Sequence, residues 1–451
     1  MVGILEMEIL KMLPDVKARK DAILSILNNV NAILDAEPAV LTINSDKLMI
    51  VGDIHGNIDA LKRVLEERER LGCNDILFLG DYVDRGDHSL DVLLVVLSLK
   101  LHDREHVFLL RGNHEHANMN FMDGFYKELD GDESFLTTVH KTYGKLSVAA
   151  VVNKRTFCVH GGIKDAISID DITKDEIDSL QYLWNDPSTH LGLRDSSRGF
   201  PVKTFGRDIF TDFMTINNFD KIIRGHQFVE NGYLWHFQKR LLTLFSCPDY
   251  SGSCNICAFA ILERSNISVH QFDTNITLLE SGLIEIHDQQ RSFPDFRIEK
   301  KQISEFTRGY IKMIDHIITS RYESVGEEES QKILSFTSEI LSDEKMNPHD
   351  IIDRIKDMMS YSLMARSTGL DEVFTGALQW AKFSAKADVL MHKNHAEVLD
   401  VIKNEKGVTS RYLMDKLGLH FHDIMKVLDI LLSDRVIMVE VVGQSVVYTL
   451  R

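Results

Sequence analysis

The sequence has few of the features that mark membrane-embedded or exported proteins. No apolar run approaches the roughly 18–20 residues that a helix needs to span a bilayer. Residues 1–24 mix acids with lysines, whereas a signal peptide places a basic segment before an uninterrupted apolar core. We therefore predict a cytoplasmic protein with neither a signal peptide nor a contact with the membrane.

Cysteine and basic residues are also scarce. The chain has 5 cysteines in 451 residues, too few for a disulfide framework, and the odd number fits a reducing compartment. Cys254 and Cys257 form an isolated C-x-x-C pair, which we interpret as two small residues packed on a strand. The formal net charge is −17. This charge argues against nucleic-acid binding by the whole protein, because binding to the phosphate backbone depends on Lys and Arg.

The first part of the chain alternates between two apolar patterns. Apolar positions at helical spacing predict a leading helix over residues 15–36. Strand-like runs then alternate with helical patterns at 58–70 and 89–100, which is typical of strand–helix–strand units around a largely parallel sheet. These runs occupy residues 39–43, 47–51, 75–80 and 106–112. Further runs predict a second, partly antiparallel sheet, at residues 145–152, 156–162, 221–227, 241–247, 257–262 and 266–272. We expect an α/β fold, with two packed sheets flanked by helices, over residues 1–285.

The composition changes after residue 285. Residues 286–391 carry helical patterns and almost no strand signal, and they suit a spacer, a lid or an oligomerisation element equally well. Residues 392–451 read as three short helices and two strand-like runs separated by Gly443 and Gln444, which is the pattern of a winged helix. The helix expected at 420–434 contains a single lysine. Because groove binding needs a positive face, we expect this domain to bind a protein partner or a second copy, rather than nucleic acid.

Polar motifs follow several of the apolar runs. The segment "GDIHGN" (52–57) presents Asp53 and His55, which point to the same side because residues i and i+2 of an extended chain share a face. Open α/β sheets place their ligands beyond the ends of their strands, so the polar residues of such motifs should meet. The motifs are "GDIHGN", "GDYVDRG" (80–86), "RGNHE" (111–115), "HGG" (160–162) and "RGHQ" (224–227). Five other histidines lack such a context and are expected on the surface or in loops: His88, His102, His106, His140 and His190.

The donor atoms in these motifs indicate a metal site. Carboxylate or amide oxygens and imidazole nitrogens, without a thiolate, favour Mn, Fe or Zn. Six such donors are too many for one catalytic ion that keeps an open position, whereas they fit two ions about 3.5–4 Å apart. The six predicted ligands are Asp53, His55, Asp81, Asn113, His160 and His226.

With these motifs in this order, the chain resembles the metal-dependent phosphoprotein phosphatases of the type 1/2A serine/threonine class. The resemblance spans roughly residues 20–275 and includes "GFYKEL" (124–129), "YLWNDP" (182–187) and "LFSCPDYSG" (244–252). It implies that Asp81 bridges two metals, of which Mn is the first choice. The first metal would be completed by Asp53 and His55, and the second by Asn113, His160 and His226.

The resemblance also implies the remaining roles. His114 would be the general acid, oriented by Asp84, and Arg85 and Arg198 would bind the phosphate. Tyr250 would lie over the site, with Tyr126 and Asp186 at its rim. A hydroxide held between the two metals would attack phosphoserine or phosphothreonine directly, because each ion lowers its pKa.

Two other functions stay open. A dinucleoside polyphosphate hydrolase shares the first three motifs, although the "CPDY" segment favours the protein phosphatase. A catalytically silent scaffold is the third hypothesis, which the intact ligand positions disfavour. The chain departs from the resembled class at Asp249, where Asn is usual, and at Ser251, where Cys is usual. The extra charge of Asp249 is expected to affect phosphate affinity or inhibitor sensitivity.

Overall fold

The computed structural model divides the chain into two compact units, residues 1–275 and 276–451, and each is described separately. The described residues are 16–129, 132–278, 283–287, 296–320, 327–343, 346–364, 370–391, 395–405, 407–417, 419, 424–425, 427–428, 431, 437–442 and 445–450. No described helix is long and apolar enough to cross a membrane.

The first unit contains a five-stranded sheet whose strand order is β14-β13-β2-β3-β4. Strands β2 (Lys47–Val51), β3 (Asp75–Phe78) and β4 (Val107–Leu109) are parallel. Helices α3 (Ile58–Arg70) and α4 (Ser89–His102) connect them, which confirms the predicted strand–helix–strand units. Strands β13 (Cys257–Glu263) and β14 (Asn266–Phe272) extend this sheet in antiparallel pairing.

The second sheet has six strands. Their order is β1 (Val40–Ile43), β5 (Ala149–Val152), β6 (Thr156–Val159), β10 (Lys221–Arg224), β12 (Leu241–Leu244) and β11 (Tyr233–His236). The pairs β5–β6 and β11–β12 are antiparallel and the other neighbours are parallel, so the sheet is partly antiparallel, as predicted.

The assignment of strands to sheets was wrong at two places. Strand β1 belongs to the second sheet instead of the first, whereas β13 and β14 belong to the first instead of the second. The link 44–46 between β1 and β2 is too short for the crossover that parallel strands of one sheet require. The chain therefore passes from one sheet to the facing sheet at this point.

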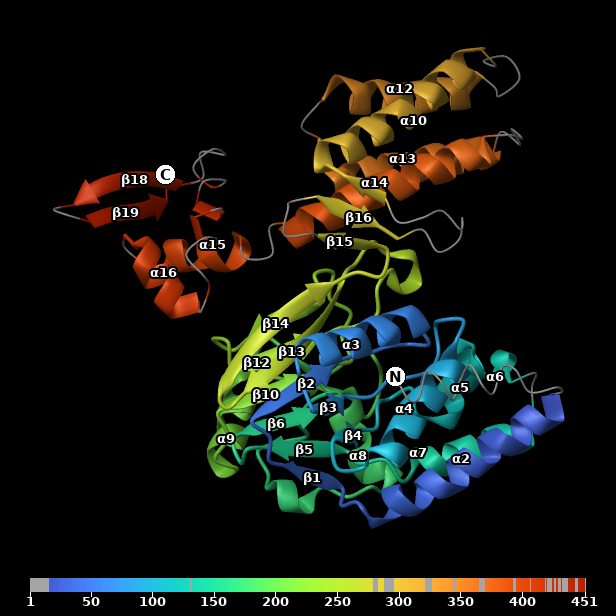
Figure 1. Ribbon diagram of the computed structural model, residues 1–451, viewed down its shortest axis with the longest axis vertical. Helices are drawn as coiled ribbons and strands as arrows, with labels where there is room; N and C mark the ends of the chain where they lie inside the picture. Colours follow the sequence, from blue (N-terminus) through green and yellow to red (C-terminus); the bar gives the residue numbers. More distant parts are fainter. Residues whose placement is uncertain are drawn as a thin grey trace. The chain divides into compact units, whose positions relative to one another are not determined.

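The two sheets form the inner layers of a sandwich. Leu48 and Ile50 of β2 point into an apolar layer shared by both sheets, while Met49 and Val51 point to the opposite side, because side chains alternate along a strand. Helices α2 (Val16–Ala36), α3, α4 and α7 (Glu133–Tyr143) cover the outer face of the first sheet. Helices α8 (Glu176–Trp184) and α9 (Arg207–Ile216) cover that of the second (Figure 1). The predicted α/β sandwich and its leading helix are confirmed.

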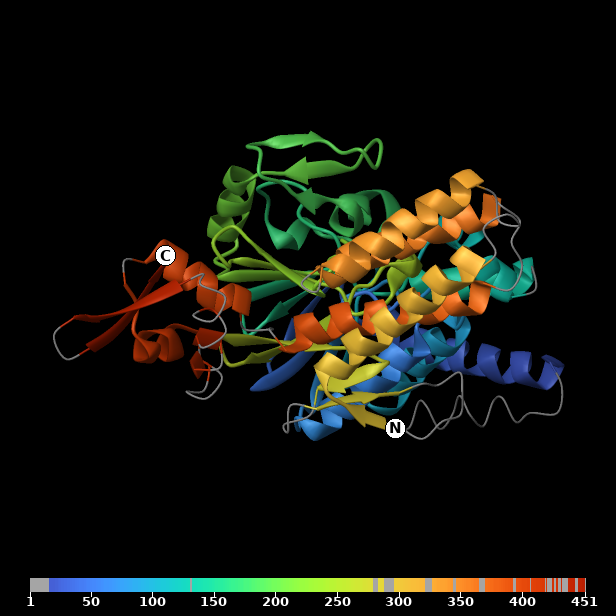
Figure 2. The same ribbon diagram turned by 90° about the horizontal axis from the view of Figure 1, so that it is seen from above.

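Several short elements of the first unit had no predicted counterpart. Helices α5 (Ala117–Asp123) and α6 (Phe125–Glu128) follow β4. A small sheet of β7 (Asp186–Pro187), β9 (Lys203–Phe205) and β8 (Leu193–Asp195) projects from the unit, in green at the top of Figure 2. Each run is too short to show a periodicity, which explains why the sequence pattern did not reveal it.

The second unit begins with an antiparallel sheet of β15 (Ile276–Leu278), β16 (Ile284–Ile286) and β17 (Phe296–Ile298). The predicted helical region follows, with α10 (Lys300–Ser320), α12 (Glu327–Ser342), α13 (Pro348–Met364) and α14 (Asp371–Met391). In α10 the buried positions are Ile303, Thr307, Ile311, Ile314 and Ile318, a stripe at helical spacing that packs on α12 and α14. The boundary predicted at residue 285 falls within β16, and the three-domain division remains a prediction.

The C-terminal segment contains α15 (His395–Asn404) and α16 (Ser410–Leu417), followed by the antiparallel pair β18 (Ile437–Val442) and β19 (Ser445–Leu450). Gly443 and Gln444, and most of the helix predicted at 420–434, lie outside the described residues. The winged-helix assignment therefore stays a prediction.

We expect the layer between the sheets to dominate the stability of the first unit. The Leu77 side chain is fully buried there, so Leu77→Ala should lower the free energy of unfolding by about 2–5 kcal/mol. Urea unfolding can be followed by the fluorescence of Trp184 and Trp235 in a Trp380→Phe background.

The matched control for this variant is Leu191→Ala. Leu191 is 65% exposed, so this substitution should change the free energy of unfolding by no more than about 0.5 kcal/mol. Equal effects of the two substitutions would contradict the assignment of the core.

Candidate metal centre

The ends of five strands bring the predicted ligands together at one edge of the sandwich. Asp53 and His55 follow β2, and Asp81 follows β3. Asn113 follows β4, while His160 and His226 follow β6 and β10 of the other sheet. A bridge between Asp53 and Phe245, together with a hydrogen bond from the Gly52 N–H to Ser246 Oγ, joins the two sheets at this edge. All six predicted ligands are buried.

Asp81 lies at the centre of this cluster. Its Oδ2 is 3.6 Å from His55 Nε2 and 3.3 Å from His160 Nε2. On one side, His55 Nε2 is 3.8 Å from Asp53 Oδ2. On the other, Asn113 Oδ1 is 2.9 Å from His160 Nε2 and 2.6 Å from His226 Nδ1. The donor atoms thus form two groups that share the carboxylate of Asp81.

The imidazoles are oriented as metal ligands require. His55 Nδ1 lies 3.0 Å from the Val83 carbonyl oxygen, and His160 Nδ1 lies 3.1 Å from that of Leu79. Because a carbonyl oxygen only accepts, each Nδ1 carries a proton, and Nε2, which faces the cluster, is the nitrogen that could bind a metal once it is deprotonated. Asp53 Oδ2 is buried without a hydrogen-bond partner. Imidazole nitrogens, an orphaned carboxylate oxygen and the amide oxygen of Asn113, gathered around Asp81, fit divalent cations.

Electrostatics set the protonation of the cluster. Burial raises the pKa of Asp53 to about 7 and lowers that of His55 to about 4, with a further contribution from His114. Burial also disfavours the charged form of Asp81, but the imidazoles of His160 and His114 hold its pKa well below the usual value. The central carboxylate is therefore ionised, as a metal ligand must be.

Strained loops and one buried acid hold this arrangement. Asp81 has a positive φ of 54°, a conformation that side chains other than glycine adopt at a cost. Glu115 accepts hydrogen bonds from the N–H groups of Asp81, Tyr82 and Gly112, at 2.8, 2.9 and 2.8 Å. A Cβ on Gly112 would lie 2.2 Å from Asp81 Oδ1, so only glycine fits there. Glu115 lies within "RGNHE", but the motif alone did not reveal this role.

His114 and Asp84 form a pair beside the cluster. His114 Nδ1 donates to Asp84 Oδ2 at 2.8 Å. Burial opposes the charged imidazole, but the carboxylates of Asp81 and Asp84 outweigh it and raise the pKa of His114 to about 9. The ring is therefore protonated near neutral pH.

Asn120 supports this pair and was missed by the sequence analysis. Its Nδ2 donates to Asp84 Oδ2 at 2.9 Å and to the His114 carbonyl oxygen at 2.8 Å. Its Oδ1 lies 3.2 Å from His140 Nε2. The prediction of a surface or loop position for His140 was wrong, because His140 is half-buried on α7 and contacts the residue that holds Asp84 and His114.

The two predicted phosphate-binding arginines are each paired with a carboxylate. Arg85 Nη2 is 3.0 Å from Asp123 Oδ1. Arg198 Nε donates to Asp186 Oδ2 at 2.7 Å, and the other oxygen of Asp186 is 3.0 Å from Nη2 of the buried Arg224. Arg224 lies within "RGHQ", but the motif alone did not reveal this pairing. Both predicted arginines are partly exposed, so they can reach a ligand.

The predicted tyrosines differ in position. The Tyr250 ring lies 5.0 Å from the His55 ring. Burial raises the pKa of its hydroxyl to about 12, against the opposing effect of the Arg85 guanidinium. Tyr126 instead packs against Phe121, with ring centroids 5.1 Å apart, and against the helix-covered core. Asp249 and Ser251, on either side of Tyr250, both have positive φ, and their expected effects remain predictions.

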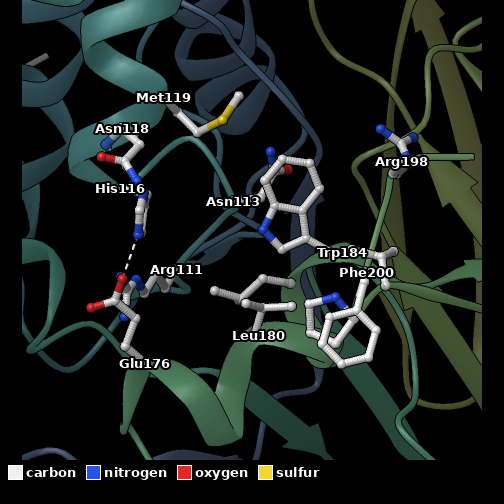
Figure 3. A pocket seen from close by; sticks show the side chains of 13 residues that line it. Arg111, Asn113, His116, Asn118, Met119, Glu176, Leu180, Trp184, Arg198 and Phe200 are labelled. Carbon is white, nitrogen blue, oxygen red and sulfur yellow. Dashed lines mark hydrogen bonds and ion pairs between the residues drawn. The ribbon is translucent and has the colours of Figure 1, made fainter. Parts of the chain in front are cut away.

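A cavity of about 250 Å³ adjoins the cluster. Figure 3 shows Asn113 and Arg198 at this cavity, near Met119 of α5, Leu180 and Trp184 of α8, and Phe200. His116 and Glu176 are hydrogen-bonded across its edge (Figure 3). The cavity thus offers an apolar wall next to a candidate metal ligand and a candidate phosphate ligand.

The shared carboxylate predicts a strong effect on metal binding. Loss of a residue that only hydrogen-bonds to a metal ligand lowers metal affinity by about 10- to 100-fold. Asp81→Asn removes a ligand itself, so it should lower the affinity for Mn²⁺ by more than this. The measurement is the metal content of the purified, Mn²⁺-loaded and desalted protein by mass spectrometry.

Asp75→Asn, at the opposite end of β3, is the control for this change. Asp75 pairs with His106 at 2.7 Å, away from the cluster, so this variant should keep the metal content of the unmodified chain. Full metal content in Asp81→Asn would contradict the predicted bridging role.

The chain is similar to known phosphoesterases over part of its length. Residues 47–230 match the family model described as calcineurin-like phosphoesterase. A serine/threonine phosphatase from Saccharomyces cerevisiae, described as similar to human phosphatase PP5, is 26% identical with a TM-score of 0.52, and the match covers 56% of this chain and 90% of that one. A cold-active protein-tyrosine phosphatase from a Shewanella species is 19% identical with a TM-score of 0.39, and the match covers 52% and 82%. Residues 47–230 thus match a calcineurin-like phosphoesterase domain.

Proposed function

We propose that the protein is a two-metal serine/threonine protein phosphatase. The observation that carries this proposal is the cluster of six buried donor residues centred on the carboxylate of Asp81, flanked by the His114–Asp84 pair and two partly exposed guanidinium groups. Phosphoryl transfer requires positioning and charge neutralisation more than covalent chemistry by the protein. This set of residues supplies both.

The metal ligands follow from the two groups of donors. Asp53, His55 and Asp81 would hold one ion, with Mn the first choice and Fe or Zn possible. Asp81, Asn113, His160 and His226 would hold the other. When bound, such ions would lower the pKa of a water and neutralise charge on the phosphoryl oxygens.

The remaining residues serve the leaving and transferred groups. Arg85 and Arg198 would bind the phosphoryl oxygens through their planar forks. As the bond between phosphorus and the serine or threonine oxygen breaks, His114 Nε2 would donate a proton to that oxygen, since Nδ1 is engaged with Asp84. Water supplies the new oxygen on phosphorus, so the products are the free hydroxyl side chain and inorganic phosphate. No phosphoenzyme is required.

A phosphoprotein substrate is supported by two observations. The Saccharomyces protein, which is described as a serine/threonine phosphatase, matches along 90% of its length. The cavity beside Arg198 has an apolar wall, which suits a side chain next to the phosphorylated residue. Binding of a protein partner or a second copy through the C-terminal region remains a prediction.

The test of substrate class is a direct comparison. The Mn²⁺-loaded chain should hydrolyse phosphoserine and phosphothreonine peptides faster than diadenosine tetraphosphate, and chelation or Asp81→Asn should abolish this turnover. Turnover of the dinucleotide alone would assign the protein to the rival class. If the metal-loaded protein hydrolyses none of these substrates, the scaffold hypothesis would be supported.

The role of His114 makes a second, independent prediction. His114→Asn should lower kcat about 100- to 10,000-fold on a phosphoserine peptide, whose alkoxide leaving group needs a proton. The loss should be much smaller on 4-nitrophenyl phosphate, because its leaving group is stable without protonation. His190→Asn, at an exposed loop histidine, serves as the control. An equal loss on both substrates would contradict the general-acid role.

A further inference from the structure

The carboxylate of Asp123 lies beside Arg85 and His114, where its negative charge would oppose the binding of a phosphate. Its Oδ1 is 3.0 Å from Arg85 Nη2, and its Oδ2 is 3.9 Å from His114 Nδ1. Its side chain is only 14% exposed, whereas that of Arg85 is 41% exposed. Asp123 is therefore mostly enclosed, with its closer contact to Arg85 and a longer one to His114.

Local helix chemistry does not explain an acid at this position. Asp123 is the last residue of α5, and the partial negative charge at the C-terminus of a helix disfavours a carboxylate. Its backbone oxygen accepts from the Arg85 N–H at 3.1 Å, so the main chain already joins the two segments. The charged side chain of Asp123 is therefore not needed to hold the loop of Arg85 against α5.

The groups of charged side chains around Arg85 and around Arg198 consequently differ in net charge. On one side, Asp186 is shared between Arg198 and the buried Arg224, which leaves one net positive charge. On the other side, Asp123 pairs with Arg85, which leaves none. A phosphate ligand therefore meets full positive charge at Arg198 and a neutralised pair at Arg85.

We propose that Asp123 is a specificity-determining residue, which weakens the binding of doubly charged phosphate groups at Arg85 relative to singly charged ones. This inference rests on the proposed role of Arg85 in phosphate binding. A negative charge that opposes substrate and product alike raises both KM and the dissociation constant of the product. The dianionic phosphate product is therefore bound weakly.

The test measures binding of inorganic phosphate to the Mn²⁺-loaded full chain by calorimetry at pH 7.5. Asp123→Asn should tighten binding about three- to tenfold, as expected for one screened unit charge near the ligand. It should also raise kcat/KM for 4-nitrophenyl phosphate, a dianion, more than for bis(4-nitrophenyl) phosphate, a monoanion. Asp87→Asn, at an exposed acid two residues from Arg85, should change the affinity by less than about twofold.

A double-mutant cycle with Arg85→Gln identifies the route of the effect. If Asp123 acts through Arg85, Asp123→Asn should no longer tighten phosphate binding in the Arg85→Gln background. An effect that persists there, or a change below about twofold in the single variant, would overturn the inference. Tightened phosphate binding without any phosphopeptide turnover would instead sustain this inference while the proposed function fails.

Discussion

The buried carboxylate of Asp81 is the interaction on which the site depends. Its Oδ2 faces imidazoles from both sheets, and its Oδ1 accepts from the His114 N–H at 2.9 Å. Its backbone oxygen accepts from the N–H groups of Ile54 and His55, at 3.0 and 2.9 Å. One residue therefore fixes the loops after β2, β3 and β4 relative to each other. A buried charge persists only when opposite charge surrounds it, so the cluster is arranged to receive cations.

The sandwich explains how so many donors reach one point. Within each sheet, parallel strands end at the same edge, and the bridge between Asp53 and Phe245 joins the two edges. Short loops with positive φ, at His55, Asp81 and His226 among others, turn the side chains inward. Such strain is tolerated because hydrogen bonds such as those of Glu115 over-determine the loop positions.

The charges around the cluster form a second level of organisation. Carboxylates accompany each group that would act on a phosphate: Asp84 on His114, Asp123 on Arg85 and Asp186 on Arg198. These pairs hold the cationic side chains in place, and they also reduce the charge that each offers. Under the proposed function, the balance of charge at each pair, rather than the number of arginines, would determine how strongly a phosphate is held.

Much of this could be predicted from the sequence, because the donor types, their order and their positions after apolar runs are local properties of the chain. The six predicted ligand residues come from such patterns, whereas the pairing of His114 with Asp84 was implied by the resemblance to the phosphoprotein phosphatases. The sheets to which β1 and β13 belong could not be predicted, because the periodicity of a strand does not specify its neighbours. Contacts between residues distant in the chain were equally hidden, such as those of Asn120 with Asp84 and of Arg224 with Asp186. The sequence by itself thus determined which chemical groups are available, and only the tertiary structure decided which of them are paired, because pairing depends on distances that folding creates.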